Sequence, residues 1–299
     1  MITDIPSPQD FEAYGIDYLN LAWEEAVGLL RKPDEFEDKY DKSDFWKAAQ
    51  RPLAMAISLC HQGIEFLLKA QIATISPFLL ISKGSSEWPK GCDKRDTPFP
   101  DFHTVDAQDI VKIYNTVYGT RLAEDFIAQF ENLRKLRNTI THTVNKNIQI
   151  TVKDILLHIL NASSTLTGKI KWLSHRRSYL DKDHDSVLYS SDENDFIMLL
   201  EMKVVVKLLG RSELLTHFGF DKRRRKYQCP VCYYASSMVT FDFPMAVIEP
   251  NTPKSTTLYC FICDQSIVVE RKACMHQNCK GNVISVEEDM CLTCTCRQE

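Results

Sequence analysis

Residues 126–142 read Phe-Ile-Ala-Gln-Phe-Glu-Asn-Leu-Arg-Lys-Leu-Arg-Asn-Thr-Ile-Thr-His. Apolar side chains recur every three or four positions from just before this stretch to near its end, at Leu122, Phe126, Phe130, Leu133, Leu136 and Ile140. This spacing predicts a helix with one buried face. Arg137 and His142, near its end, are five residues apart, which is about 140° of rotation on a straight helix. They would converge only if the helix ends or bends near Thr141, or if a second copy of the chain completes the site.

The sequence around this stretch predicts more helices. The expected ranges are about Phe11–Leu29, ended by Pro33, then Pro52–Pro77, Asp106–Val117 and, after a break near Asn145–Asn147, Thr151–His175. Gly63 within the second helix costs about 1 kcal/mol relative to alanine, so we expect a close approach of another helix there. Residues 83–103, rich in Gly, Pro and Asp, predict an irregular insertion. Long helices joined by short turns favour an antiparallel bundle over residues 1–180.

The composition is that of a globular protein of 299 residues, with 44% hydrophobic and 25% charged residues. A net charge of -4 provides no general attraction to nucleic acid, so an anionic partner requires a local basic patch. The first residues lack the basic and apolar segments of a secretory signal. No apolar run approaches the ~20 residues of a spanning helix. These features favour a cytoplasmic protein without a membrane partner.

Cysteine is concentrated near the end of the chain, where nine of the 11 cysteines lie between Cys229 and Cys296. In a chain without a secretion signal, cysteines in such pairs indicate metal binding rather than disulfides. The two expected groups are Cys229, Cys232, Cys260 and Cys263, and Cys274, Cys279, Cys291 and Cys294, the second with Gly281 in its turn. His276 or Cys296 could replace one ligand of the second group. We expect two structural zinc ions per chain, and no catalytic metal because four cysteines leave no open coordination position.

The residues around these cysteines form short β-like runs separated by turn residues, at 238–241, 245–248, 257–259 and 267–269. They predict a small β-rich zinc-ribbon domain over 227–299. Residues 181–226 are expected to connect it to the bundle, with an apolar helix near Phe196–Leu209. This connector ends in the basic run Lys222–Lys226, which can neutralise phosphates or can be a solvated linker.

The helical part of the chain resembles the HEPN domain family over about residues 8–178. The family signature is an arginine, a polar residue directly after it, and a histidine that four to six residues separate from the arginine. Here these are Arg137, Asn138 and His142, and the segment His61–Ala70 is similar to an earlier helix of the family. The expected fold is therefore mainly α, a HEPN-like antiparallel helical bundle followed by the small β-rich zinc-ribbon domain.

The resemblance implies a metal-independent endoribonuclease, of the toxin or antiviral-defence kind, that acts as a homodimer on RNA. It also implies a composite site at the twofold interface and a 2′,3′-cyclic phosphate product. The residue chemistry agrees, since His142 can exchange the proton of a 2′-hydroxyl near neutral pH and Arg137 can bind the phosphate. Asn138 could orient either group, and Glu65, in the matching helix, could hold Arg137. An antidote or partner protein is a further expectation.

Alternative interpretations remain open from the sequence. Arg137 could pair with Glu131 or Glu124, His142 could be a residue stabilised by the helix dipole, and Glu65 could be a surface acid. His61 and His103 are interpreted as core, capping or loop residues. The competing functional class is a non-catalytic protein whose bundle dimerises and whose ribbon binds nucleic acid or another subunit. A zinc-dependent enzyme is disfavoured.

Overall fold

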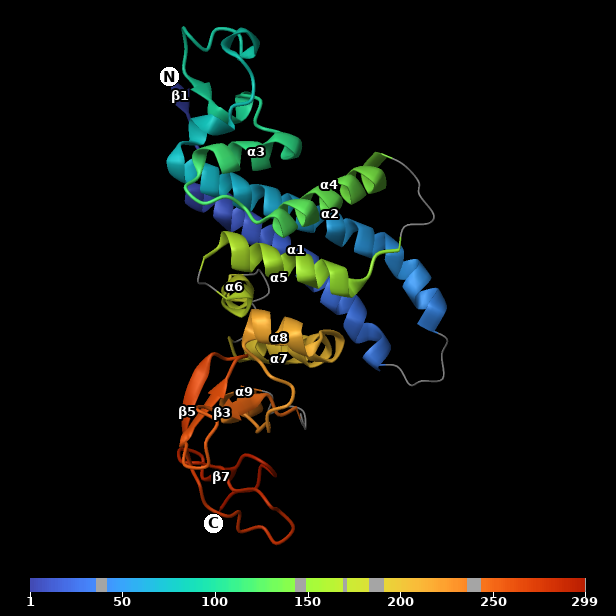
Figure 1. The fold of residues 1–299 in the computed structure, drawn as a ribbon, viewed down its shortest axis with the longest axis vertical. Coiled ribbons are helices and arrows are strands. Elements are labelled where there is room, and N and C mark those ends of the chain that lie inside the picture. The colour runs from blue at the N-terminus through green and yellow to red at the C-terminus, as the bar shows by residue number, and fades with distance from the viewer. Residues whose placement is uncertain (36–41, 143–148, 169–170, 183–190, 236–242, 299) are drawn as a thin grey trace. The chain divides into compact units, whose positions relative to one another are not determined.

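A computed structural model describes residues 1–35, 42–142, 149–168, 171–182, 191–235 and 243–298 (Figure 1). The described residues form two compact units, Met1–Trp172 and Leu173–Glu299. Most of the chain is helical, and strands are concentrated in the second unit beside the cysteines. The expectation of a mainly α protein with a small C-terminal strand-containing region is confirmed at this level.

The first unit is a group of packed helices with a short parallel strand pair. Its elements are β1 (Ile2–Thr3), α1 (Pro8–Glu35), α2 (Lys42–Ile75), η1 (Pro77–Leu80), η2 (Ser85–Glu87), β2 (Thr97–Pro98), η3 (Phe99–Asp101), α3 (Ala107–Val117), α4 (Glu124–His142) and α5 (Val152–Leu166). Helix α2 lies at the centre of this unit and packs against α1, α3, α4 and α5 (Figure 1). The irregular insertion expected at 83–103 contains η2, β2 and η3, each two or three residues long, joined by turns.

Helices α1 and α2 cross at two glycines. A Cβ atom placed on Gly63 would lie 2.8 Å from the side chain of Leu19 and 2.9 Å from the backbone oxygen of Gly15. A Cβ atom on Gly15 would lie 2.9 Å from the side chain of Leu67. The close helix approach that Gly63 predicts is confirmed, and the order of the contacts makes the two helices antiparallel.

Substituting Gly63 with alanine is expected to destabilise the first unit by about 1–3 kcal/mol, because the added methyl group overpacks the crossing. The matched control is Gly28→Ala in α1, where an added Cβ has no neighbour within 4 Å. There the better helix propensity of alanine should stabilise by up to about 1 kcal/mol. Urea unfolding of both variants measures the difference, and an equal effect at the two positions would contradict the close crossing.

Two helix boundaries differ from the expectation, because Pro33 does not end α1 and Pro52 does not start α2, whereas α2 ends just before Pro77 as expected. Helix α2 begins at Lys42 and contains Pro52 in its interior, and α1 extends two residues beyond Pro33. A residue outside α2 stabilises the turn before Pro52. The side-chain amide of Gln50 accepts a hydrogen bond from Ile150 N at 2.8 Å and donates one to Ile150 O at 3.2 Å. These contacts offset the loss of the proline N–H.

The prediction of a single helix over 151–175 is wrong, because α5 ends at Leu166 and a separate helix, α6 (Trp172–Leu180), follows. Thr167 caps α5, and Gly168 follows with a φ of +70°, a left-handed conformation that glycine adopts readily at helix ends. The expected break at 145–147 and the expected β-like run at 238–241 lie outside the described residues.

The second unit combines the helices α6 to α9 with a sheet beside the cysteines. Its remaining elements are α7 (Ser191–Leu208), α8 (Arg211–Phe218), α9 (Pro230–Ala235), β3 (Ala246–Ile248), β4 (Thr257–Cys260), β5 (Gln265–Glu270), β6 (Ile284–Ser285) and β7 (Met290–Cys291). The described strands form one antiparallel sheet in chain order. Strands β3, β4 and β5 coincide with expected β-like runs, whereas the helix α9 directly after Cys229 does not.

The described part of the expected connector belongs to this second unit. Helix α6 is joined to α7 by a buried ion pair in which Arg176 donates to Glu201 at 2.7 and 3.1 Å. Phe220, after α8, packs on Phe261 with ring centroids 4.7 Å apart. The helices and the sheet thus share one core. Among the described residues, none of the helices combines the length and the apolar composition needed to span a membrane.

Candidate functional site

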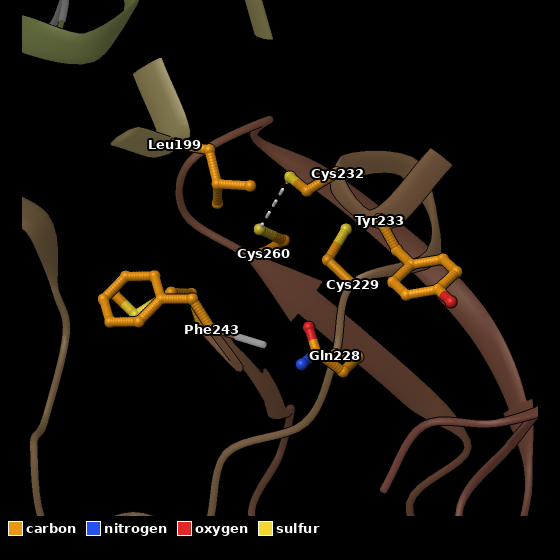
Figure 2. Close-up of a pocket in the computed structure, with 8 residues that line it drawn as sticks. Leu199, Gln228, Cys229, Cys232, Tyr233, Phe243 and Cys260 are labelled. Carbon is orange, nitrogen blue, oxygen red and sulfur yellow. Dashed lines mark hydrogen bonds between the residues drawn. The ribbon is translucent and has the colours of Figure 1, made fainter. Parts of the chain in front are cut away.

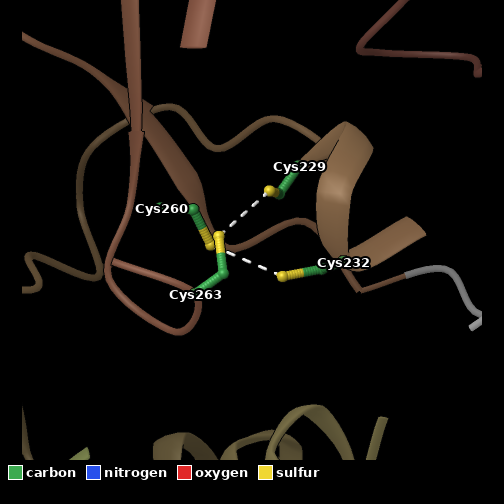
Figure 3. A group of neighbouring side chains, drawn as sticks. All are labelled: Cys229, Cys232, Cys260 and Cys263. Carbon is green, nitrogen blue, oxygen red and sulfur yellow. Dashed lines mark hydrogen bonds between the residues drawn. The ribbon is translucent and has the colours of Figure 1, made fainter. Parts of the chain in front are cut away.

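The first cysteine centre is formed by two chain segments 28 or more residues apart. Cys229 precedes α9 and Cys232 lies in its first turn, while Cys260 ends β4 and Cys263 lies in the turn to β5. Figure 3 shows the four side chains converging. Their Sγ atoms are 3.6 Å apart for Cys229 and Cys263 and 3.8 Å apart for Cys232 and Cys260.

These distances fit a tetrahedral metal ion. Zinc–sulfur bonds of about 2.3 Å at tetrahedral angles place two sulfurs about 3.8 Å apart, whereas a disulfide requires about 2.05 Å. Every cysteine of the described residues is free. All four donor atoms lie within 4.8 Å of one another, and each residue is buried. The group can therefore hold a metal ion with no position left for a substrate.

The surroundings of this centre belong to the core of the second unit. Leu199 of α7, Phe243 and Met245 line the space beside Cys232 and Cys260 (Figure 2). Hydrogen bonds with the neighbouring thiols, and then burial, raise the pKa of Cys232 well above its ordinary value. A bound cation would reverse that tendency, because metal coordination favours the thiolate.

The second centre has the same spacing but is less buried. Its Sγ distances are 3.7 Å for Cys274 and Cys294 and 3.8 Å for Cys279 and Cys291. Backbone N–H groups point at its sulfurs, from His276 to Cys274 at 3.4 Å and from Gly281 to Cys279 at 3.2 Å. Such N–H donors stabilise thiolate charge around a metal.

The surplus candidates His276 and Cys296 lie outside both groups of potential ligands found among the described residues. His276 contributes its backbone N–H to Cys274, and the thiol of Cys296 donates to the backbone oxygen of Cys294 at 3.6 Å. The eight cysteines expected from their spacing are therefore the ones brought together.

Substituting Gly281 with alanine is expected to remove one of the two bound metal ions. The added Cβ would lie 2.7 Å from Cys291 Sγ and 2.9 Å from the side chain of Thr293, so the ligand has to move. Metal analysis should fall from about two ions per chain to about one. Gly119→Ala is the control, since nothing lies within 4 Å of its added Cβ. Retention of both ions in Gly281→Ala would contradict the assigned packing.

The first unit contains a polar cavity of about 350 Å³. It lies between α2, the start of α3 and the C-terminal half of α4. The lining residues are His61, Gln62, Glu65, Asp106, Ala107, Gln108, Arg134, Arg137 and Asn138. This cavity brings together three of the four candidate catalytic residues, Arg137, Asn138 and Glu65.

Arg137 donates to the side-chain oxygen of its neighbour Asn138 at 3.0 Å. The ion pair considered for Arg137 and Glu131 is instead made by Arg134, whose closest approach to Glu131 is 2.8 Å. Glu65 pairs with Lys69 at 2.7 Å, and both side chains are largely buried. Among the described residues, no ion pair joins Glu65 to Arg137, although both line the cavity. Arg137 is thus oriented by Asn138.

His142 is the last residue of α4 and is exposed, outside the residues that line the cavity. Leu136 and Ile140, on the same end of the helix, are half-exposed, whereas Phe130 and Leu133 are buried. Arg137 therefore lines the cavity, whereas His142 does not.

His61 is a cavity residue that the sequence did not single out for function. Its side chain is 2% exposed and its ring stacks on Phe130, with centroids 5.3 Å apart. Within the described parts of the chain, neither ring nitrogen has a hydrogen-bond partner. Burial lowers the pKa of His61 to about 4, so the ring is neutral at pH 7. No sequence signal marked it, because a histidine on an apolar helix face resembles a core residue.

The basic run Lys222–Lys226 is largely engaged within the second unit. Lys222 donates to Leu209 O at 2.6 Å, and Arg224 pairs with Glu249 and donates to Ile248 O. Arg225 lies over Tyr227 at 5.3 Å, and the Lys226 ammonium lies 5.8 Å from the ring centroid of Phe220. The run therefore presents fewer free cations to a phosphate backbone than its composition indicates.

No protein-family model, no curated protein sequence and no solved structure matches this chain.

Proposed function

We propose that the first unit is a metal-independent endoribonuclease of the HEPN type, of the toxin or antiviral-defence kind. The supporting observation is the pairing of Arg137 with Asn138 on the wall of a polar cavity, with His142 exposed at the end of the same helix. An arginine in such a place suits a phosphate that gains charge in the transition state.

The proposed reaction uses the 2′-hydroxyl of the substrate as the nucleophile. His142 takes the proton of this hydroxyl while its oxygen attacks the neighbouring phosphorus. The bond from phosphorus to the 5′-oxygen breaks, and that oxygen receives a proton. The products are a 2′,3′-cyclic phosphate and a 5′-hydroxyl. Arg137 neutralises the phosphate, and Asn138 holds the guanidinium.

The proposed active form is a homodimer, in which His142 of one chain acts beside Arg137 of the other. Within one chain the two side chains occupy different directions on α4. Leu136 and Ile140 offer half-exposed apolar surface beside them that a second copy would cover. A twofold interface repeats the same contacts on both sides and therefore creates two such sites.

The two cysteine centres are proposed to bind zinc, in a role that stabilises the second unit. Zinc favours four sulfur ligands at the distances found here. The zinc-ribbon unit would select the RNA or a partner protein, such as an antidote that restrains the nuclease.

Incubation of the purified protein with total RNA, with and without EDTA, tests the function. We expect cut ends bearing 2′,3′-cyclic phosphate and 5′-hydroxyl groups, formed at the same initial rate when EDTA is added together with the RNA. An immediate stop on addition of EDTA would contradict the proposed chemistry. Absence of cleavage of any RNA would contradict the function.

A non-catalytic interaction protein is the second candidate. The observation that favours it is an exposed apolar pair in the second unit, Val268 at 66% and Val286 at 51% exposure. The two lie on adjacent segments, since Val286 N donates to Val268 O at 3.4 Å. On this alternative the exposed pair contributes to the surface that binds a partner protein, and no RNA is cut.

A further inference from the structure

We infer that the irregular insertion of the first unit, residues 83–103, binds single-stranded RNA outside the catalytic site. The residues that make this contact are Trp88, Lys90, Lys94 and Arg95, which together form the insertion surface. The indole of Trp88 stacks on a base, and the three cations bind phosphates. This inference rests on the proposed ribonuclease function and adds a second binding surface for the same substrate.

The insertion is anchored beside the wall of the polar cavity, next to α3 (Figure 1). Its two ends are held together, because Ser82 N donates to His103 O at 2.9 Å and Val105 N donates to Leu80 O at 2.8 Å. The chain then continues directly into Asp106, which lines the cavity. An RNA strand that leaves the cavity past Asp106 would therefore continue toward the insertion.

The three cations of the insertion surface belong to one tight turn. Gly91 has a φ of +79°, and its backbone oxygen accepts hydrogen bonds from Lys94 N at 3.0 Å and Arg95 N at 3.1 Å. The guanidinium of Arg95 donates to Lys90 O at 3.5 Å. All three side chains are exposed, and none of them makes an ion pair among the described residues. The turn thus presents three positive charges to the solvent.

The acidic residues of the insertion do not neutralise these cations. Glu87 pairs with Lys83 at 3.5 Å, and Asp96 pairs with the amino group of Met1 at 2.9 Å. This leaves three cations against the carboxylate of Asp93, a formal excess of two positive charges. Because the whole chain has a net charge of -4, binding of RNA requires a local excess of this kind.

Trp88 supplies the aromatic surface on which a base can stack. It is 37% exposed, its Nε1 donates to Lys83 O at 2.9 Å, and its ring packs at 82° on the buried ring of Phe102, with centroids 5.5 Å apart. These contacts hold the indole in one orientation and leave part of it in solvent, so little side-chain freedom is lost on binding. Bases of single-stranded RNA stack on aromatic side chains of this kind.

This combination favours a nucleic acid over a membrane surface. Anionic phosphates are common to both, but a peripheral membrane contact uses a long amphipathic helix whose apolar face enters the lipid boundary. The helices of the insertion, η2 and η3, have three residues each. An aromatic ring beside several cations is the arrangement that surfaces for single-stranded nucleic acid use.

Binding of a labelled oligouridylate tests the role of Trp88. The full-length protein carries His142→Ala, which keeps the RNA intact, and fluorescence anisotropy gives the Kd. We expect Trp88→Leu, which keeps an apolar group against Phe102, to weaken binding by about tenfold through loss of stacking. Trp88→Phe, which keeps an aromatic face, should recover most of the affinity. Tyr14→Leu is the control, since Tyr14 is 61% exposed on α1, outside the insertion.

The salt dependence of binding tests the cations. Replacing Lys90, Lys94 and Arg95 together with glutamine should reduce the slope of log K against log salt by about two, because each phosphate contact on a single strand contributes about 0.7. The matched control removes the same charge from exposed positions on three helices, Lys32, Arg51 and Lys112. An equal loss in this control would overturn the inference, as would wild-type affinity in either Trp88→Leu or the triple variant.

Two further measurements identify other causes of a loss. If urea unfolding shows that Trp88→Leu has lost stability, the triple variant decides, since its three side chains are exposed. Vesicles of phosphatidylcholine and phosphatidylserine test the membrane. Vesicle binding that the triple variant abolishes, together with an unchanged affinity for RNA, would overturn the inference in favour of a lipid contact.

Cleavage separates this inference from the proposed ribonuclease function. With a long RNA the triple variant should raise the KM and leave kcat unchanged, whereas a dinucleotide, which occupies the catalytic site alone, should be cut at the wild-type rate. A wild-type KM for long RNA in the triple variant overturns the insertion surface alone. RNA binding that depends on the insertion surface, without cleavage by the wild-type protein, overturns the ribonuclease proposal and supports the insertion surface.

Discussion

Replacing His142 or Arg137 with alanine is expected to reduce RNA cleavage by about 10²–10⁴-fold, the usual contribution of a positioned general base or of an electrostatic stabiliser. Neither side chain is buried, so fold and metal content should remain unchanged. His103→Ala is the matched control, because His103 is an exposed histidine in a loop of the same unit. Initial rates on a single-stranded RNA provide the measurement.

A mixture of the two inactive variants tests the composite site. If His142 of one chain acts with Arg137 of its partner, a mixed dimer of Arg137→Ala and His142→Ala contains one intact site. Random exchange of subunits makes half of the dimers mixed, so about a quarter of the wild-type rate should return. A mixture as inactive as its components would contradict the site shared between chains, and full activity in either single variant would contradict the mechanism.

Loss of metal from the first cysteine centre, by chelation or by Cys229→Ser, is expected to unfold the second unit. Structural zinc supplies about 10–16 kcal/mol in small zinc domains, as much as the whole stability of a typical domain. The effect should reach α7 and α8, because Leu199 lies beside the cysteines and Phe220 packs on Phe261. Hydrogen exchange would show loss of protection in α7 and β4 and retained protection in α2.

Metal analysis supplies the controls for this experiment. The wild-type protein should contain about two zinc ions per chain, one for each group of four cysteines. Cys92→Ser and Cys296→Ser should leave that number unchanged, since neither residue belongs to a group. A wild-type protein that folds without metal would refute the assignment of both centres.

The sequence predicted the positions of α1 to α5 and α7 from their apolar faces, although it joined α5 and the start of α6 into one helix. Helix α4 and its buried residues Phe126, Phe130 and Leu133 follow directly from the spacing of 3.6 residues. The end of α1 and the start of α2 were missed, because Pro33 was taken as a stop and Pro52 as a first residue, whereas both lie inside their helices. A contact 100 residues away, between Gln50 and Ile150, holds the chain helical before Pro52, and no local pattern reveals such a contact.

The two cysteine groups were also predictable, because a metal knuckle is a local motif whose spacing reflects the bond geometry. The polar cavity was not. Its walls come from residues 61–65, 106–108 and 134–138, and only the packing of three helices brings these segments together. The contacts of Lys222 and Arg224 could not be predicted from the sequence either, since their partners Glu249, Ile248 and Leu209 are distant along the chain.

The steric contact between Gly15 and Gly63 holds α2 in one position relative to α1. A shift of one residue along the helix rotates it by about 100° and would bring a side chain into a contact that admits only hydrogen. His61 and Glu65 lie two residues on either side of Gly63 and face away from α1, toward the cavity. The close contact at the two glycines therefore sets the rotation of α2 about its axis. It thereby determines which residues of the opposite helix face line the cavity.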